Sequence, residues 1–441
     1  MILLLPFILG LFFILTSFYI WRKSQIFFLF YFVLFAYTFF TQIGYLLYPE
    51  YLSLVSHYQY YGEEAFIPYW IYIFLSFVSI FLMFAIFYHK KYRTKLSIKV
   101  KTLPKKPANF LYTILILFYE SVLTIFLIKN YANLSYLNQG LLKGNKIWFY
   151  LFSLGGVVLL SLFCKIYMEY GRKKKIYYFV LFFVLLSIFS LTAIRSGQRI
   201  EVMEALLGFA ASLWYLFRDK IRFEGWKLKY TFVILIIFFI GISFSQGIRM
   251  TRGHDESQEA FFTSLKSLET YLSIFFLENL IFQDWLCPSL TLMTSIERNI
   301  IFPGKVIESN LTILIPFISH ESLGGILSRI IDPEGIQGYG YYILTEGYNF
   351  IGFFGFVYSS FIFVIGLRLL GSFFANTNDK LFNAFMYGIM GFSAIYVVRG
   401  GQTIVFLKGL YLYFLPAIIL FILMSNKKVY LTGPKIKSKI N

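Results

Sequence analysis

Residues 27–40 read FFLFYFVLFAYTFF and contain no charged side chain. Runs of about 18 to 22 mostly apolar residues recur along the chain, and each is long enough to cross a bilayer core of about 30 Å as a helix. In lipid the backbone must satisfy its own hydrogen bonds, which favours helices. A membrane β-barrel would alternate apolar and polar positions, and this stretch does not. The sequence therefore predicts an all-α fold, a polytopic membrane helical bundle.

The composition of the whole chain fits this class. Of 441 residues, 58% are hydrophobic and only 14% are charged, whereas a soluble domain is about half apolar and a quarter charged. We predict about eleven transmembrane helices, within a range of about ten to twelve. The predicted helices cover residues 2–21, 25–48, 67–88, 109–128, 147–168, 176–194, 200–217, 230–246, 343–366, 381–398 and 403–424.

The distribution of Lys and Arg predicts the orientation in the membrane. Loops after odd-numbered spans, together with the C-terminal tail, hold 26 basic residues, and loops after even-numbered spans hold 12. Short basic loops stay in the cytoplasm, so the N-terminus is predicted to be periplasmic and the C-terminus cytoplasmic. Most of the net charge of +18 is then a topology signal, with anionic lipid head groups as a secondary contact. Nucleic acid is not an expected partner.

Three parts follow from this topology. An N-terminal bundle of about eight helices covers residues 1–246, a large periplasmic loop covers 247–342, and C-terminal helices with a basic cytoplasmic tail cover 343–441. A loop of this length is usually functional. Residues 261–275 show helical apolar spacing, which predicts an amphipathic helix on the membrane surface or against the bundle. Prolines break the rest of the loop into short pieces: Pro288, Pro303, Pro316 and Pro333.

Arginines gather at helix ends on the predicted outer side: Arg195, Arg199, Arg249, Arg252 and Arg399. Arg195 and Arg199 are four apart, so a helix that included both would place them on one face. Charge at membrane depth is costly and usually serves a ligand or a pathway. Guanidinium groups bind phosphate or carboxylate oxygens bidentately. Alternatively, the arginines reach lipid phosphates or pair with Glu201, Glu204 and Asp255.

Candidate bases are few. His320 and His254 lie in the large loop and can act as general bases near neutral pH, or be ordinary solvated residues. Glu120 lies midway along a predicted span, where a carboxylate is either functional or paired with another helix. No P-loop, HExxH, GxSxG or metal-ligand cluster occurs, so neither a cofactor nor a metal site is predicted.

Residues 338–355 read GYGYYILTEGYNFIGFFG. This stretch resembles the Wzy-type O-antigen or oligosaccharide repeat-unit polymerases, in which a GxG and a Glu-x-Tyr-x-Asn-Phe-Gly-like segment lead into a late helix. Here Ile351 separates Phe350 from Gly352, so the match is imperfect. The segment 195–199, RSGQR, is similar to the family's Ser/Gly/Arg motif at a periplasmic helix start.

A second motif of some members, Arg-x10-Gly, is met by Arg329 and Gly340. Because the chain contains many arginines and glycines, about one such match is expected by chance, and we give it little weight.

The resemblance implies a metal-independent glycosyltransferase of the bacterial inner membrane. It would move a growing glycan from undecaprenyl pyrophosphate onto the next lipid-linked repeat unit, in the periplasm. Implied partners are this lipid-linked oligosaccharide, the bilayer, and a chain-length regulator and flippase of the same pathway. The implied binding residues for pyrophosphate and sugar are the five outer arginines with Arg329, Tyr348 and Asn349, and the candidate bases are Glu346, His320 and Asp332.

Other functions stay open. An O-antigen ligase shares the layout and relies on a loop histidine, for which His320 is a candidate. A lipid-linked oligosaccharide flippase or other transporter would favour charged residues within the bundle, shorter loops and internal repeats, and no repeats are visible. A non-enzymatic membrane scaffold would leave the outer arginines unexplained.

Overall fold

The structure, a computed structural model, describes residues 4–47, 63–88, 97–102, 108–130, 146–168, 172–196, 199–217, 286–313, 323–331, 341–374, 379–400, 413–425 and 427–432. The chain forms two compact units, each assembled from segments far apart in the sequence. The first unit comprises residues 1–94, 276–371 and 394–409, and the second comprises 95–275, 372–393 and 410–441.

The first unit opens with three helices: α1 (Leu4–Lys23), α2 (Gln25–Leu47) and α4 (Glu63–Phe87). Aromatic rings fill the contact between α1 and α2, where Phe13 stacks on Phe35 with ring centroids 3.7 Å apart. The opposite face of α1 carries exposed apolar side chains, such as Phe7 and Phe18, each 69% exposed. An apolar outer surface is what a helix in contact with lipid requires.

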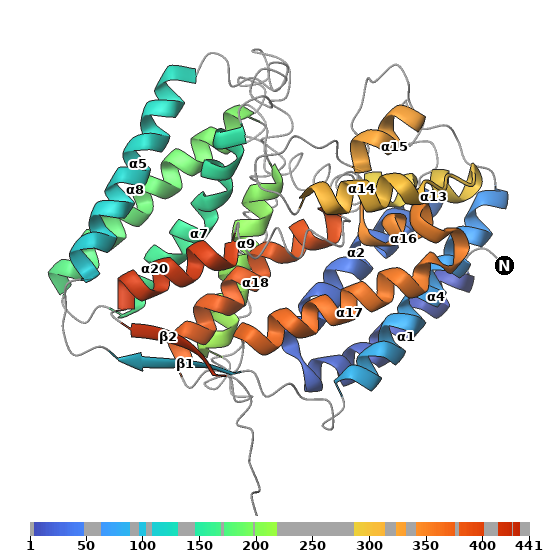
Figure 1. Cartoon of the computed structure of the whole chain (residues 1–441), viewed down its shortest axis with the longest axis horizontal. Helices are drawn as coiled ribbons and strands as arrows, with labels where there is room; N and C mark the ends of the chain where they lie inside the picture. Colours follow the sequence, from blue (N-terminus) through green and yellow to red (C-terminus); the bar gives the residue numbers. More distant parts are fainter. Residues whose placement is uncertain are drawn as a thin grey trace, which may run out of the picture. The chain divides into compact units, whose positions relative to one another are not determined.

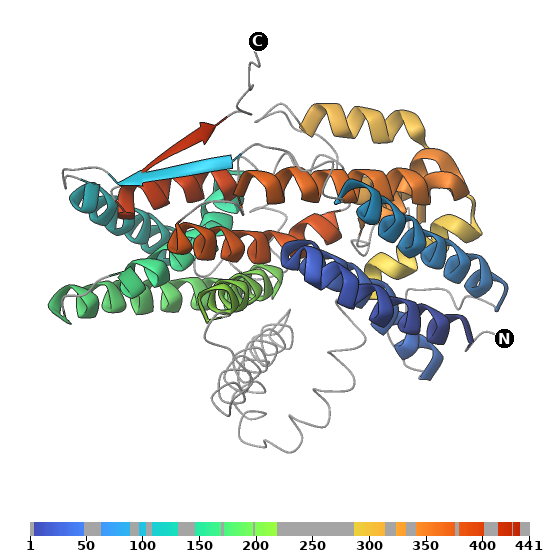
Figure 2. The same ribbon diagram turned by 90° about the horizontal axis from the view of Figure 1, so that it is seen from below.

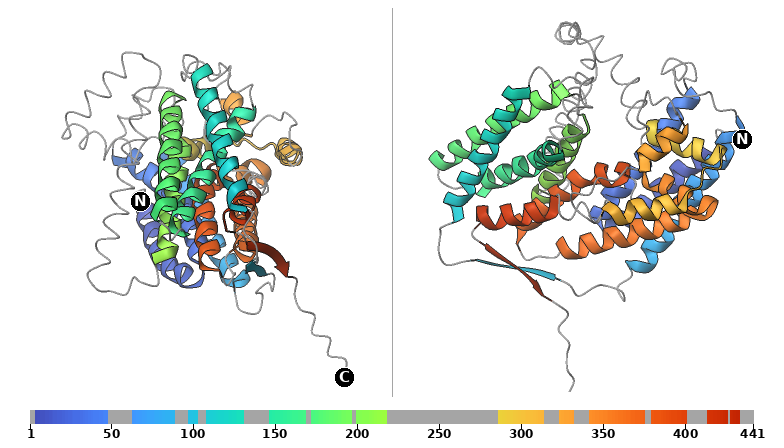
Figure 3. Two further views of the ribbon diagram at one scale, coloured as in Figure 1. Left: turned by 90° about the vertical axis from the view of Figure 1, so that its left-hand side faces the viewer. Right: turned by 45° about the horizontal axis from the view of Figure 1, so that its top comes forward.

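The same unit holds four short helices and one long one. They are α13 (Leu286–Glu297), α14 (Pro303–Ile313), α15 (Leu323–Ile331), α16 (Ile343–Ile351) and α17 (Gly355–Phe374). Figure 1 and the right-hand view of Figure 3 show α13, α14, α15 and α16 gathered near the first turns of α17. The short lengths agree with the predicted breaks, because Pro303 begins α14 and Pro288 lies in the first turn of α13.

Helix α13 belongs to the segment predicted to be a periplasmic loop, yet it packs against α2, α4 and α16. Its Ser and Thr side chains are buried, and the Ser289 hydroxyl donates to the Tyr37 carbonyl at 2.6 Å. A helix rich in Ser and Thr reads as polar in a hydropathy profile. The Ser289 hydroxyl is thus satisfied inside the unit instead of in water, whereas the buried Ser295 hydroxyl has no hydrogen-bond partner among the described residues.

The second unit contains α5 (Ala108–Asn130), α7 (Lys146–Met168), α8 (Arg172–Ser196), α9 (Arg199–Phe217) and α20 (Leu415–Ser425). Helix α18 (Lys380–Gly400) begins here, and its residues from 394 onward belong to the first unit. The left-hand view of Figure 3 shows α5 and α8 side by side. Small residues bring α9 and α18 together, since a Cβ on Gly208 would lie 2.9 Å from the Gly388 carbonyl oxygen.

The described part of the chain contains six helical segments long and apolar enough to cross a membrane: Leu4–Lys23, Phe66–Phe87, Phe110–Lys129, Arg172–Thr192, Ile343–Gly371 and Lys380–Val398. Shorter apolar helices cover Gln25–Phe39, Leu154–Met168, Glu204–Leu216 and Leu415–Ser425. These segments overlie predicted spans, so the helical fold is confirmed and the lengths and composition of the helices agree with a membrane protein. They do not establish a count of about eleven. The predicted span 230–246 and the amphipathic helix 261–275 lie outside the described residues.

The predicted span 343–366 falls within the apolar segment Ile343–Gly371, but this segment is not one continuous helix. Helix α16 ends at Ile351, a 3-10 turn η5 (Gly352–Phe354) follows, and α17 begins at Gly355. Gly352 has a φ of 67°, which glycine adopts readily and other residues rarely do. Hydropathy alone does not detect the break, because residues on both sides of the turn are apolar.

A small sheet also departs from the all-α prediction. Strands β1 (Ser97–Thr102) and β2 (Lys427–Thr432) pair antiparallel, with Val100 opposite Val429. Figure 2 shows the two strands side by side. From the sequence, both segments were predicted only to be basic and cytoplasmic, and neither was predicted to be a strand. The two strands are more than 300 residues apart, so no local sequence pattern indicates that they pair.

Candidate functional site

The site is built on a tight turn that folds α16 back along the first turns of α17. The Ser359 hydroxyl donates to the Ile343 carbonyl at 2.7 Å. Gly347 and Gly355 meet without side chains between them, because a Cβ on Gly355 would lie 1.9 Å from the Gly347 carbonyl oxygen. The two glycines therefore allow a backbone contact that fixes the α16 side chains against α17.

Glu346 lies at the centre of this arrangement and has no exposed surface. Its Oε1 accepts a hydrogen bond from Asn310 Nδ2 of α14 at 3.0 Å and one from the Tyr358 hydroxyl of α17 at 3.1 Å. Hydrogen bonds to a carboxylate are roughly twice as strong as neutral ones. Two neighbouring helices, α14 and α17, thus hold one carboxylate oxygen in a defined position, which a general base or a charge-stabilising group needs.

Tyr348 and Asn349, the next polar residues of the motif, contact the turn between α13 and α14. The Tyr348 hydroxyl donates to Asn299 Oδ1 at 3.3 Å, and Asn349 Nδ2 donates to the Ile300 carbonyl at 2.7 Å. The amide of Phe302 donates to the Asn349 carbonyl at 2.8 Å. These contacts join α16 to the segment predicted as a large loop, so a structural role for both residues is directly visible.

Several buried polar atoms near Glu346 have no hydrogen-bond partner among the described residues, and Thr345 Oγ1 and Asn349 Oδ1 of α16 are among them. Two others belong to residues outside α16. They are the Tyr341 hydroxyl and Asn310 Oδ1. The Tyr341 side chain belongs to a buried cluster that includes Val306 of α14, and Phe350 of α16 packs against that cluster. Val306 and Asn310 are one turn apart on α14, and Phe350 and Glu346 are one turn apart on α16. The cluster that contains Tyr341 therefore includes residues one turn from Asn310 on α14 and one turn from Glu346 on α16.

The electrostatics agree with this placement. Burial raises the pKa of the Tyr341 phenol well above its usual value, and the Glu346 carboxylate and the Tyr358 and Tyr72 phenols raise it further. A phenol in such a place stays neutral and keeps its proton for donation at physiological pH.

The side chains of the five predicted outer arginines are not among the described parts of the structure. Arg195 lies in the last turn of α8, Arg199 begins α9, and Arg399 lies near the end of α18. Because Arg195 and Arg199 belong to two separate helices, the geometry of a shared helical face does not apply to them. Their side chains, with the whole of Arg249 and Arg252, lie outside the described residues, as do His320, His254 and Asp332.

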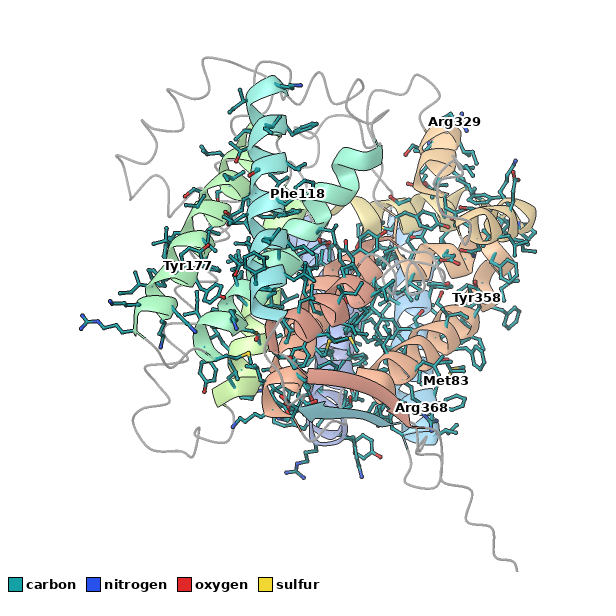
Figure 4. The ribbon with its side chains drawn as sticks, turned by 60° about the vertical axis from the view of Figure 1, so that its left-hand side comes forward. Met83, Phe118, Tyr177, Arg329, Tyr358 and Arg368 are labelled. Atoms are coloured by element: carbon teal, nitrogen blue, oxygen red, sulfur yellow. The ribbon has the colours of Figure 1, made fainter. Side chains whose placement is uncertain are left out.

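Arg329 is described and lies in the last turn of α15, where its side chain is exposed. Figure 4 labels Arg329 and Tyr358 and shows them well apart. The Arg-x10-Gly spacing therefore does not bring this arginine to Glu346.

Glu120 forms a separate feature in the second unit. It is 6% exposed, and its Oε1 has no hydrogen-bond partner in the described part of the chain. The expected pairing with another helix is thus not seen for this oxygen. The described residues contain no group of three or more His, Cys, Asp or Glu side chains that could hold a metal ion.

Sequence reasoning found Glu346 through its motif but missed two of its partners. Asn310 precedes Glu346 by 36 residues and Tyr358 follows it by 12, so neither contact is local enough for a helical or strand periodicity to predict it. Tyr341 is part of the quoted motif, but the sequence does not indicate that its hydroxyl is buried without a hydrogen-bond partner. Comparison of the chain with protein-family models, with curated proteins and with solved structures finds no match.

Proposed function

We propose that the chain is an inner-membrane glycosyltransferase that polymerises undecaprenyl-pyrophosphate-linked repeat units into O-antigen or a similar surface polysaccharide. The observation that carries the proposal is Glu346, a buried carboxylate held by Asn310 and Tyr358 within the segment that resembles this family. The membrane helices supply the environment that a lipid-linked substrate requires.

In the proposed reaction, Glu346 takes the proton of an acceptor-sugar hydroxyl as its oxygen attacks C1 of the donor sugar. The bond from C1 to the pyrophosphate oxygen breaks, and undecaprenyl pyrophosphate leaves with the bonding electrons. The products are a longer glycan on the acceptor lipid and one free lipid pyrophosphate. A positioned base contributes about 10²- to 10⁴-fold to such a step.

The leaving pyrophosphate needs positive charge, which we assign to the outer arginines. Replacing Arg195, Arg199, Arg249 or Arg252 by Ala is expected to abolish polymerisation at several of these positions, with protein amounts unchanged. Lys is not expected to restore activity fully, because it lacks the planar fork of guanidinium. Polysaccharide gels check this prediction. Wild-type ladders from all four Ala variants would show that these arginines are not needed for polymerisation and contact only lipid or other side chains.

A ligase that transfers the glycan to a lipid A core is the alternative within the same chemistry. It would use the same donor and would depend on His320 rather than on Glu346. The two activities are distinguished by testing whether Glu346 or His320 is essential for synthesis of the polysaccharide.

Transport of the lipid-linked oligosaccharide is a second candidate, of another class. It is favoured by charged side chains buried within the second unit, namely Glu120, Lys165 and Glu204, which are 6%, 3% and 3% exposed. Lys165 Nζ donates to the Met424 carbonyl at 3.0 Å, which is a helix-capping contact and weakens the case that this charge serves transport.

Deletion of the gene separates the three functions. Loss of a polymerase leaves core with a single repeat unit on a polysaccharide gel. Loss of a ligase leaves core alone while lipid-linked polymer accumulates, and loss of a flippase leaves core alone without polymer. Full-length ladders from the deletion strain would contradict all three.

A further inference from the structure

Two of the unpaired atoms near Glu346 lie at a place where an unmade hydrogen bond is costly. The Tyr341 side chain is 5% exposed, and both its hydroxyl and Asn310 Oδ1 are shielded from solvent. A buried donor or acceptor left without a partner costs about 1–3 kcal/mol. Replacing Tyr341 by Phe would remove that cost and keep the ring in its apolar contacts, so the hydroxyl is not explained by packing.

Together the atoms offer complementary hydrogen bonding. The neutral phenol can donate, the amide oxygen can accept, and the Glu346 carboxylate can accept beside them. A sugar hydroxyl both donates and accepts, so it can satisfy the phenol and the amide oxygen together. An apolar ligand could satisfy neither of them, and a phosphate group could not donate to the amide oxygen.

We propose that Tyr341 and Asn310 form a subsite that binds a hydroxyl group of a carbohydrate beside Glu346. The inference rests on the proposed function and deepens it, since it places a sugar of the acceptor repeat unit at this cluster. Asn310 then has two roles through one amide, because its Nδ2 holds Glu346 while its Oδ1 accepts from the sugar.

The test uses the full-length chain in detergent and the repeat-unit oligosaccharide released from its lipid by mild acid. Binding is measured by calorimetry for the wild type, Tyr341→Phe and Tyr31→Phe. Tyr31 is a matched control, because it is equally buried in the first unit and its hydroxyl is already paired with Thr16 at 2.9 Å. We expect Tyr341→Phe to weaken binding about two- to twelve-fold, without lowering Tm.

The control variant is expected to behave in the opposite way. Tyr31→Phe should lower Tm, because it breaks a buried hydrogen bond, and should leave the dissociation constant unchanged. Equal binding by Tyr341→Phe and wild type, with a raised Tm, would overturn the subsite, as would wild type that binds no oligosaccharide.

Chain extension by wild-type membranes supplied with lipid-linked repeat units tests the proposed function separately. Binding without extension would reject the polymerase and retain the subsite. Extension with unaltered binding by Tyr341→Phe would reject the subsite and retain the polymerase.

Discussion

At the scale of residues, Asn349 is the clearest structural anchor of the motif. Its side-chain amide and its carbonyl both bond the turn after α13, at 2.7 and 2.8 Å. Tyr348 reaches the same turn through longer hydroxyl contacts of 3.3 and 3.4 Å. Tyr348 and Asn349 therefore both attach α16 to the end of α13 and the turn that follows it, and Asn349 makes the shorter hydrogen bonds.

Replacing Asn349 by Ala should destabilise the protein by about 1–3 kcal/mol, because the partner carbonyl loses its donor beneath α16. Tyr348→Phe should cost less, since it removes only the longer bonds. Thermal unfolding of the purified protein in detergent measures both. Lys305→Ala is the control, because it removes an exposed ion pair with Glu308 that is worth at most about 1 kcal/mol. Equal Tm for Asn349→Ala and Lys305→Ala would contradict the anchor.

The candidate site could be predicted from the sequence only in part. The motif pointed to Glu346, Tyr348 and Asn349 because their types and spacing are local. Asn310 and Tyr358 reach Glu346 only after α14 and α17 pack against α16, and tertiary packing of this kind leaves no periodic trace in the chain.

At the scale of elements, the turn between α16 and α17 depends on two glycines in contact. A Cβ on Gly347 would lie 2.1 Å from the Ser359 hydroxyl oxygen and 2.3 Å from the Gly355 carbonyl oxygen. Backbone atoms cannot move away without separating the two helices. At Gly371, further along α17, an added Cβ would have no atom within 4 Å.

Gly347→Ala and Gly355→Ala should therefore displace α16, move Glu346 from Tyr358, and lower both protein yield and activity. Gly371→Ala should be neutral or stabilising by up to about 1 kcal/mol, since alanine favours a helix interior over glycine. Yield of monodisperse protein and Tm compare the three variants. Wild-type Tm and activity from Gly355→Ala would show that α16 and α17 do not pack in this way.

Hydropathy predicted the long described helices because their apolar runs are long and uniform, but it predicted none of the short helices α13, α14 and α15. Hydropathy did not separate α16 from α17, because both helices are apolar and the turn between them is short and contains glycine. It also assigned α13 to the outer loop, because Ser and Thr lower its hydropathy while the structure buries them. Errors arose where close backbone contact or buried hydroxyls, not apolar length, determined the structure.

At the scale of the whole molecule, the β1–β2 pair constrains the topology. Paired strands lie on the same side of a membrane, so the chain between residues 102 and 427 must cross it an even number of times. The predicted spans from 109–128 to 403–424 number eight, which is an even number. The pairing brings the two basic segments together, and their cytoplasmic location stays a prediction.

A double-cysteine variant, Val100→Cys with Val429→Cys, should form a disulfide on mild oxidation in a chain whose two native cysteines are replaced by Ala. Opposite residues of antiparallel strands have Cα atoms about 4.5–5.5 Å apart, which a disulfide can span. Ser97→Cys with Lys427→Cys, at opposite ends of the pair, should not cross-link. Cross-linking of the second pair alone would contradict the register.

The account as a whole depends on Glu346 acting in glycan polymerisation, and Glu346→Gln tests this most directly. Gln keeps a side-chain oxygen for Asn310 and Tyr358 to bond, so the fold should survive while the ability to take a proton is lost. The measurement is the polysaccharide gel of a deletion strain expressing this variant at wild-type levels. We predict core bearing a single repeat unit, with polymer reduced about 10²-fold or more. Full-length ladders from Glu346→Gln would contradict the account.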